Sequence, residues 1–581
     1  MSSTLRGIPA VSGIAIGNCF LFDPTPLVIP QHSIESEAIA TEREYLLQAV
    51  AASMKEVSEL HDHVQERLGN DAAAIFNAHL LMLEDEALLE GAYQRIEHEL
   101  MNAAQAFWAS AEEYAQIIAE LNDNYFRARV ADIHDIRIRI VCHLLGRSIP
   151  HLRAMSTSAI IVARDLLPSD TVGLDPTIVL GLVTEQGGPT SHTAILARQL
   201  GIPAVVGVSG LLAAFRSMST PPTRIAIDGD AGTVELDPEL TTITHFEDNL
   251  HSYRQRQQEL EAFRTRPAVT LDNVRVEIAA NIGRPQDAGP AVEAGADGVG
   301  LFRSEFLFLD RATPPDEEEQ LAAYRTVLET FAGKTVIIRT LDIGGDKFIP
   351  YLALAPESNP FLGLRGIRLC LAEAHQHLFR TQLRALLRAA EPNVASLWIM
   401  LPMICDIREL RQTKAIIADA EATLLEEGKI GSPVRQHLRL GIMVETPAAA
   451  LLVDVLAKEA DFFSIGTNDL AQYTLASDRM NASLVELHRP FHPAVMRSIA
   501  HIVSIARKHK CWVGMCGEMA GDPRASAFLV GLGINELSME LNSFNAVKQV
   551  ICNTTISSAQ DLVEYVLKAE SAEAVEAYLT P

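Results

Sequence analysis

Residues 186–198 read Gln-Gly-Gly-Pro-Thr-Ser-His-Thr-Ala-Ile-Leu-Ala-Arg, and the flanking segments place this stretch at the centre of a strand–turn–helix unit. The apolar run 178–183 predicts a buried strand before the turn. Two glycines and a proline predict the turn itself, and the amphipathic segment 194–200 predicts a helix. This order is typical of an α/β domain, and it places His192 at the N-terminus of the helix.

The surroundings of His192 favour chemistry with an anion. Backbone N–H groups at a helix N-terminus are unpaired and attract negative charge. A neutral imidazole there can accept a phosphoryl group, whose oxygens the hydroxyls of Thr190, Ser191 and Thr193 can solvate. Most of the 18 histidines must have no such role, because a lone histidine is usually a surface or core residue. The small residues beside His192 leave its ring uncovered, so we predict a histidine that can be phosphorylated.

Length, charge and cysteine usage limit the class of protein. A chain of 581 residues is too long for one core and predicts about three or four domains. The net charge of -26 argues against a nucleic-acid partner and allows a basic protein partner. Seven scattered cysteines without CxxC or zinc spacing indicate free thiols in a reducing cytosol. We see neither a signal peptide nor a membrane-spanning run, so we expect a cytoplasmic protein without a membrane partner.

The first 240 residues predict an α/β domain with a helical insertion. Short apolar runs cut by Gly and Pro indicate strands before residue 30, and strand texture returns after residue 147. Between them glycine nearly vanishes and apolar residues recur at helical spacing. We therefore assign 1–30 and 148–240 to the α/β domain and 31–147 to an inserted, all-α subdomain.

The rest of the chain predicts a (β/α)8 TIM barrel that follows a helical linker. Residues 241–265 are polar with helical spacing, which indicates the linker. Residues 266–581 alternate between strand and helix patterns, as such a barrel requires. The predicted strands are 274–282, 298–302, 335–341, 397–403, 440–444, 462–465, 512–515 and 536–539. The fold class is thus multidomain α/β.

Arginines, acids, one amide and one thiol lie at or after the ends of these predicted strands, at the barrel end where catalytic groups lie. They are Arg303, Arg339, Glu445, Asn468, Asp469, Arg479 and Cys516. Arginine can bind phosphate or carboxylate with two hydrogen bonds. Glu445 and Asp469 come from adjacent strand ends and suit Mg²⁺, which takes few protein ligands. An amide can bind a substrate oxygen, and a thiol of tuned pKa can transfer a proton.

Each of these residues also has a plainer interpretation. A single arginine at a strand end is often part of a structural ion pair, and two acids can simply balance the arginines. A buried cysteine is usually inert, as we expect for Cys370, Cys405 and Cys552. Cys511 falls at the start of its strand, away from the site. The joint pattern nevertheless predicts a Mg²⁺-dependent barrel for a small phosphorylated carboxylate, tethered to a domain with a phosphorylatable histidine.

The same stretches resemble Enzyme I of the bacterial phosphoenolpyruvate:sugar phosphotransferase system over nearly the whole chain. Besides the stretch around His192, the matching segments are 300–306, 338–347, 359–365, 441–447, 463–470 and 515–518. The resemblance implies that His192 is phosphorylated and that Cys516 protonates the enolate carbon to give pyruvate. It implies that phosphoenolpyruvate is bound by Arg303, Arg339, Asn468, Asp469 and Arg479, that Mg²⁺ is held by Glu445 and Asp469, and that Arg365 and Lys347 contribute.

The family's activity follows from the same resemblance. The phosphoryl group of phosphoenolpyruvate would pass to His192 and then to the phosphocarrier protein HPr, as the first step of sugar uptake. The subdomain 31–147 would dock HPr, and the barrel would form a homodimer. Since the histidine and the barrel lie in different domains, we expect a swivelling phosphohistidine domain with its hinge near 241–265.

Two departures and two other functions stand beside this interpretation. Pro189 replaces a residue that is often basic, which we expect to alter the rigidity of its loop or the environment of phosphorylated His192. Glu540 replaces a residue that is usually small, which we expect to affect the last barrel loop and not the chemistry. A phosphoenolpyruvate synthase or pyruvate phosphate dikinase would need an ATP-grasp domain, for which the residues before His192 are too few and too helical. An inactive regulatory paralogue would have lost motif residues, yet all of them are present.

Overall fold

The computed structural model describes residues 3–580 except 24–26, 69, 84, 121–123, 148–151, 153–154, 156, 172–173, 189–190, 219, 310, 312, 346–348, 353, 356, 392–394, 480, 482–483 and 485. The chain divides into two compact units, Met1–Arg256 and Gln257–Pro581. The boundary falls inside helix α9 (Leu240–Glu261), which lies within the predicted linker 241–265 for most of its length.

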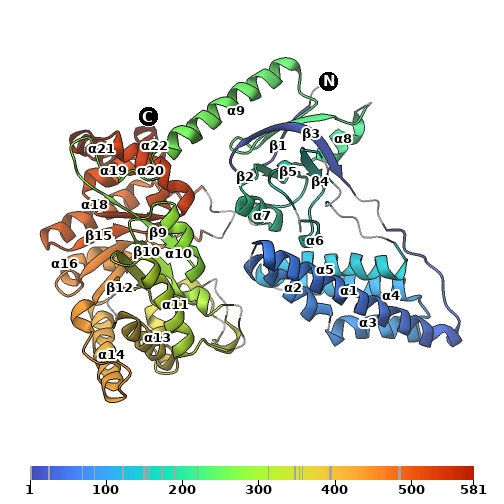
Figure 1. Ribbon diagram of the computed structural model, residues 1–581, viewed down its shortest axis with the longest axis horizontal. Helices are drawn as coiled ribbons and strands as arrows, with labels where there is room; N and C mark the ends of the chain where they lie inside the picture. The colour runs from blue at the N-terminus through green and yellow to red at the C-terminus, as the bar shows by residue number, and fades with distance from the viewer. Residues whose placement is uncertain are drawn as a thin grey trace. The chain divides into compact units, whose positions relative to one another are not determined.

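The first unit contains a mixed sheet in the order β1-β8-β7-β3-β4-β5-β6-β2 (Figure 1). Its strands are β1 (Ser3–Arg6), β2 (Ile8–Val11), β3 (Ile14–Phe22), β4 (Ala159–Ala163), β5 (Val179–Thr184), β6 (Ala204–Val206), β7 (Arg224–Asp228) and β8 (Thr233–Leu236). β3 pairs in parallel with β4, although a long helical segment separates them in sequence. The sheet buries apolar residues on both faces, against α7 (His192–Leu200) on one and α8 (Leu211–Ser217) on the other.

The helical block between β3 and β4 forms its own core. Its helices are α1 (Ile39–Leu68), α2 (Asn70–Leu83), α3 (Glu86–His98), α4 (Ala103–Glu120) and α5 (Asn124–Leu144), and α6 (Pro168–Thr171) follows β4. They pack as antiparallel neighbours in Figure 1, with α1 against α2 and α4 against α5. On α1, Leu46, Val50, Val57 and Val64 recur at helical spacing and are buried in this core, which is why this low-glycine segment forms a bundle.

The second unit is a closed barrel of parallel strands. The strands are β9 (Glu277–Ile282), β10 (Val299–Arg303), β11 (Thr335–Arg339), β12 (Ser396–Leu401), β13 (Arg439–Val444), β14 (Phe462–Ile465), β15 (Trp512–Met515) and β16 (Glu536–Met539). β16 pairs with β9 and closes the ring. Outward-facing residues of every strand pack against the surrounding helices in one continuous core.

Helices cover the outside of this barrel (Figure 1). They are α10 (Ala288–Glu293), α11 (Glu317–Thr330), α12 (Ile367–Leu371), α13 (Gln376–Ala390), α14 (Ile407–Glu426), α15 (Pro447–Leu451), α16 (Val453–Leu456), α17 (Thr467–Leu475), α18 (Pro493–Lys508), α19 (Pro523–Leu532), α20 (Phe544–Cys552), α21 (Ile556–Lys568) and α22 (Ala572–Leu579). The predicted fold class, an α/β domain with a helical insertion followed by a TIM barrel, is confirmed.

Aromatic side chains fill the N-terminal end of the barrel interior. Trp398 lies 4.8 Å from Phe462 and 4.9 Å from Trp512 between ring centroids. Phe462 and Trp512 each begin their strand, so the cluster lies where the strands enter. This end is therefore packed, and the polar groups gather at the opposite end, where the strands finish.

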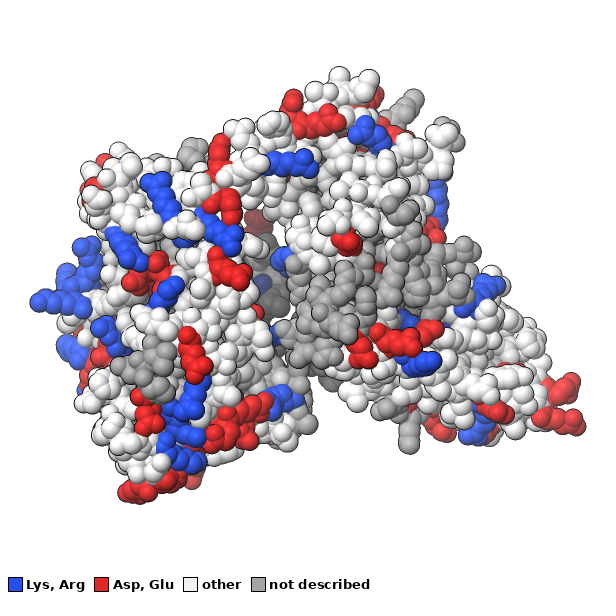
Figure 2. Space-filling model, in the orientation of Figure 1, with Lys and Arg blue, Asp and Glu red and all other residues white. Residues whose placement is uncertain are grey.

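Charged side chains of neighbouring helices pair on the second unit. Arg384 and Arg388 of α13 contact Glu317 of α11 at 2.5 and 2.7 Å, and Figure 2 shows basic and acidic side chains next to one another over the barrel. None of the helices in the described part of the chain combines the length and apolarity that a membrane crossing requires.

Candidate active site

The stretch around His192 adopts the predicted strand–turn–helix geometry. Helix α7 begins at His192, and the hydroxyl of its N-cap, Ser191, accepts a hydrogen bond from the Ala194 N–H at 3.3 Å. Gly187 in the turn has φ of 99°, a conformation that favours glycine. Pro189 and Thr190 lie outside the described residues, and with them the expected effect of Pro189.

The hydroxyl of Thr193 is already engaged. It donates to the Leu166 carbonyl at 3.4 Å, and Thr193 is 1% exposed. The Thr193 hydroxyl thus has a backbone partner in this arrangement, and its part in solvating a phosphoryl group stays a prediction. Its side chain instead ties the first turn of α7 to the segment that follows β4.

Two buried arginines and their acids form the floor of the barrel site. Arg339, the last residue of β11, contacts Glu305 at 2.5 Å and Asp342 at 3.0 Å. Arg365 contacts Asp342 at 3.3 Å and Asp469 at 2.8 Å. Positive and negative groups thus alternate across the site, so each buried charge has an opposite neighbour.

Glu445 and Asp469 converge from neighbouring strands. Glu445 follows β13 and Asp469 lies in the first turn of α17, which follows β14. The Oε1 atom of Glu445 accepts a hydrogen bond from the Met403 N–H at 2.6 Å. Burial, together with the charges of Asp469 and Asp342, raises the pKa of Glu445 to about 8. Buried carboxylates that repel one another are an environment that a cation would stabilise.

The donor set fits Mg²⁺. Both side chains offer hard oxygen atoms, which Mg²⁺ prefers over softer ligands. Within the described ranges, no group of three or more His, Cys, Asp or Glu side chains is arranged to hold a metal. A pair of carboxylates can serve an ion such as Mg²⁺, which takes few protein ligands and completes its shell with substrate and water.

Cys516 directly follows β15 inside the same mouth. It is 4% exposed, and its carbonyl accepts a hydrogen bond from the Asn281 amide at 3.2 Å. The Asn281 carbonyl oxygen in turn accepts from the Ser538 hydroxyl at 2.7 Å. Burial raises the pKa of the Cys516 thiol to about 11, so the thiol keeps its proton at neutral pH. Arg339 and Arg303 are among the charges that act on it.

The remaining predicted ligands also contact acids. Asn468 donates to Glu518 at 2.9 Å and accepts from the Glu518 N–H at 3.0 Å. Arg479 lies 3.7 Å from Asp469. Arg303 lies 3.5 Å from Glu540, so the contacts of this carboxylate are not confined to its own loop. The loop after β16 brings this carboxylate to the end of β10 because the barrel closes.

Comparison with known proteins identifies the family. Residues 257–556 match the family described as "PEP-utilising enzyme, PEP-binding domain", 6–129 match the N-terminal family of PEP-utilising enzymes, and 155–232 match their mobile domain. The phosphoenolpyruvate-protein phosphotransferase of Bacillus subtilis (strain 168) is 42% identical over 99% of both chains. The chain belongs to the phosphoenolpyruvate-protein phosphotransferase family. Relatives of the same name from Geobacillus stearothermophilus and Staphylococcus carnosus are 42% and 41% identical over 99% of this chain, and 97% and 98% of theirs.

Family membership confirms the resemblance found in the sequence, but some residues of the site were not predicted. Asp342 and Glu305 pair with the arginines, and the Tyr473 hydroxyl accepts from Arg365 at 3.1 Å. The first two lie within the polar runs after their strands, which was the available signal. Lys347, predicted to contribute, lies outside the described residues.

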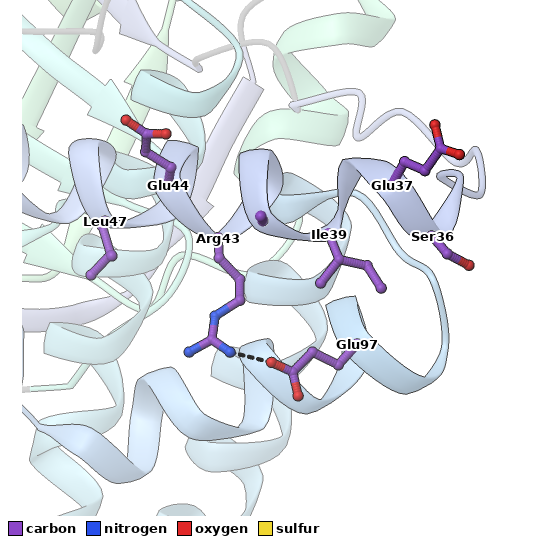
Figure 3. Close-up of a pocket in the computed structure, with 8 residues that line it drawn as sticks. Ser36, Glu37, Ile39, Arg43, Glu44, Leu47 and Glu97 are labelled. Atoms are coloured by element: carbon purple, nitrogen blue, oxygen red, sulfur yellow. Dashed lines mark hydrogen bonds and ion pairs between the residues drawn. The ribbon is translucent and has the colours of Figure 1, made fainter.

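The helical block carries a shallow hollow of about 560 Å³ (Figure 3). It is lined by Ser36, Glu37, Ile39, Ala40, Arg43, Glu44, Leu47 and Glu97. In Figure 3 the Arg43 guanidinium reaches Glu97, while Leu47 lies along the same helix and is exposed. The hollow thus combines charged groups with an exposed apolar side chain, as protein docking surfaces often do.

Proposed function

We propose that this protein transfers the phosphoryl group of phosphoenolpyruvate to His192 and then to the phosphocarrier protein HPr, releasing pyruvate. The observation that carries the proposal is the match over 99% of both chains to a phosphoenolpyruvate-protein phosphotransferase. The convergence of arginines, carboxylates and one thiol at the end of the barrel supports it, because such a set suits a phosphorylated carboxylate.

The arginines are the proposed anchors of the substrate. Arg303, Arg339 and Arg479 would bind its phosphate and carboxylate oxygens, and Asn468 and Asp469 would complete the contacts. Arg339 is held in place by two acids, which supports a fixed anion site and not a flexible one. Arg365 would act indirectly, because its two hydrogen bonds to Asp469 orient that carboxylate.

Glu445 and Asp469 are the proposed ligands of Mg²⁺. Bound there, Mg²⁺ would neutralise charge on the transferring phosphoryl group. Glu445 must be ionised to bind a cation, and its raised pKa means that it gives up its proton on binding. The backbone N–H of Met403 would keep the other carboxylate oxygen oriented.

Cys516 is the proposed acid. When the bond between phosphorus and the enol oxygen breaks and the bond to the His192 nitrogen forms, an enolate remains. The Cys516 thiol then gives its proton to the terminal carbon of the enolate, which yields pyruvate, and solvent returns a proton to the thiolate. A thiol that stays protonated at neutral pH supports this role.

The domain roles complete the proposal. The segments 1–30 and 148–240 would carry the phosphoryl group, 31–147 would dock HPr near the hollow at Arg43 and Leu47, and 241–265 would permit the movement between sites. The barrel, 266–581, would hold phosphoenolpyruvate and form a homodimer. In this role the protein would act in the cytoplasm, at the first step of sugar uptake.

Transfer of ³²P from labelled phosphoenolpyruvate tests the proposal. We expect Mg²⁺-dependent label on the wild type and on a control, His437→Ala, which changes an exposed histidine of the barrel unit. His192→Ala should take up no label. Label that persists in His192→Ala contradicts the proposal, and label that arrives from ATP indicates a dikinase. Adding HPr should remove the label from the wild type.

A further inference from the structure

An acidic side chain occupies one of the proposed substrate anchors. Glu540 follows β16, and its Oε1 atom lies 3.5 Å from the Nη2 atom of Arg303, the last residue of β10. The side chain of Arg303 is 37% exposed and that of Glu540 is 67% exposed. The ion pair therefore lies at the open rim, where an incoming anion meets it.

Two further acids lie near Glu540, but both are committed to other partners. Asp287 accepts hydrogen bonds from the N–H groups of Gly283 and Arg284 at 3.0 and 2.9 Å. Glu518 exchanges hydrogen bonds with Asn468. Glu540 is thus the carboxylate of this group that faces Arg303, and the two others add negative charge beside it.

We propose that Glu540 competes with phosphoenolpyruvate for Arg303 and so sets the substrate concentration at which the site fills. This inference rests on the proposed function, in which Arg303 binds the anionic substrate. To bind, the substrate must displace the Glu540 carboxylate, which remains nearby and repels it. When pyruvate leaves, the same carboxylate can pair with Arg303 again.

The competition should change binding more than chemistry. Removing Glu540 frees Arg303 equally for the bound substrate and for the transition state, so KM falls while kcat is unchanged. An exposed ion pair is weak, and a nearby charge in water adds a modest repulsion. We therefore expect an increase in affinity of about two- to tenfold.

The test replaces Glu540 by glutamine, which keeps the shape of the side chain and removes its charge. The matched control is Glu564→Gln, because Glu564 on α21 also forms one exposed 3.5 Å ion pair, with Lys568. We would measure the Kd of phosphoenolpyruvate by calorimetry in a His192→Ala background, where no transfer follows binding, and KM and kcat from pyruvate release with HPr in proteins that keep His192. Glu540→Gln should lower Kd and KM about two- to tenfold at constant kcat. Glu564→Gln should match the wild type.

The outcomes separate this inference from the proposed function. If the wild type binds and turns over phosphoenolpyruvate but Glu540→Gln has the same Kd and KM, competition is excluded and the function stands. If neither protein binds phosphoenolpyruvate, the proposed function and this inference both fail. A further variant, Arg303→Ala, tests whether Glu540 acts through Arg303. In the Arg303→Ala background, Glu540→Gln should lose most of its gain in affinity for phosphoenolpyruvate. An undiminished gain in that background would overturn competition at Arg303.

Discussion

The guanidinium of Arg365 holds both carboxylate oxygens of Asp469, with Nη1–Oδ1 and Nη2–Oδ2 distances of 3.3 and 2.8 Å. The same guanidinium contacts both oxygens of Asp342 at 3.3 Å. All three side chains are nearly buried. A planar fork that grips two carboxylates fixes the geometry of the proposed metal ligand Asp469 more firmly than a single contact would.

Removing the fork should destabilise the barrel. Arg365→Met leaves Asp342 and Asp469 buried without their shared partner, which typically costs about 3–5 kcal/mol. Arg365→Lys keeps the charge but cannot form two parallel hydrogen bonds, so the loss should be smaller. Urea unfolding of the second unit measures the free energy of unfolding of both variants. Arg408→Met, which breaks an exposed pair with Asp406, should leave the transition unchanged. Equal destabilisation by Arg365→Met and Arg408→Met would contradict the special role of Arg365.

The strands of this barrel could be predicted from the sequence because each is an apolar run bounded by polar or turn-forming residues. The runs 462–465, 512–515 and 536–539 coincide with β14, β15 and β16. The first barrel strand begins at Glu277 and not at residue 274, because Arg275 instead bridges back to Val269. A local pattern identifies a buried apolar run. It does not show that the chain folds back on itself just before that run, as residues 269–275 do.

The partners of the site residues could not be predicted in the same way. Arg339 and Asp469 stand at strand ends, and the rule that polar groups gather there was enough to select them. The contact between Arg303 and Glu540 joins residues far apart in sequence and depends on how the loop after β16 turns. Burial matters too: the thiol of Cys516 keeps its proton because the barrel encloses it, which the sequence alone does not state.

Replacing the proposed acid should stop pyruvate formation without unfolding the protein. Cys516→Ala removes the proton donor, while the loss of one small buried side chain leaves the fold intact. Pyruvate release by a coupled dehydrogenase assay, with circular dichroism as the fold check, measures this. Cys511→Ala is the control. Cys511 is also buried, but it lies just before the first residue of β15, at the other end of that strand from Cys516. Normal turnover by Cys516→Ala would mean that another group supplies the proton.

The hydrogen bonds behind Cys516 should affect the protonation step. Asn281 uses its amide N–H toward the Cys516 carbonyl and its oxygen toward Ser538. Asn281→Asp keeps the acceptor and the size but loses the N–H donor when ionised, so the end of β15 is less firmly held. We expect a lower kcat for pyruvate release with an unchanged KM. Ser538→Ala, which leaves the bond to Cys516 in place, should have the smaller effect. The reverse order of effects would contradict positioning by Asn281.

A buried acid at the other end of the barrel should make stability depend on pH. Glu536 begins β16, is 1% exposed, and its Oε1 atom has no hydrogen-bond partner in the described part of the chain. Burial, and then the charges of Glu277 and Asp297, raise its pKa well above the ordinary value of 4.5. Above pH 4.5 the folded protein therefore keeps a proton that the unfolded chain releases. Folding then binds a proton, so stability must fall as pH rises through this window.

Glu536→Gln should remove this dependence, because the amide cannot ionise. For one proton the wild type should lose up to about 1.4 kcal/mol of unfolding free energy per pH unit relative to the variant. Urea unfolding of the second unit between pH 5 and 8 gives the two slopes, and the exposed Glu564→Gln should follow the wild type. Parallel slopes for wild type and Glu536→Gln would mean that the Glu536 carboxyl is already ionised in the folded barrel. In that case a counter-charge must reach its Oε1 atom, since an isolated carboxylate is not stable at such burial.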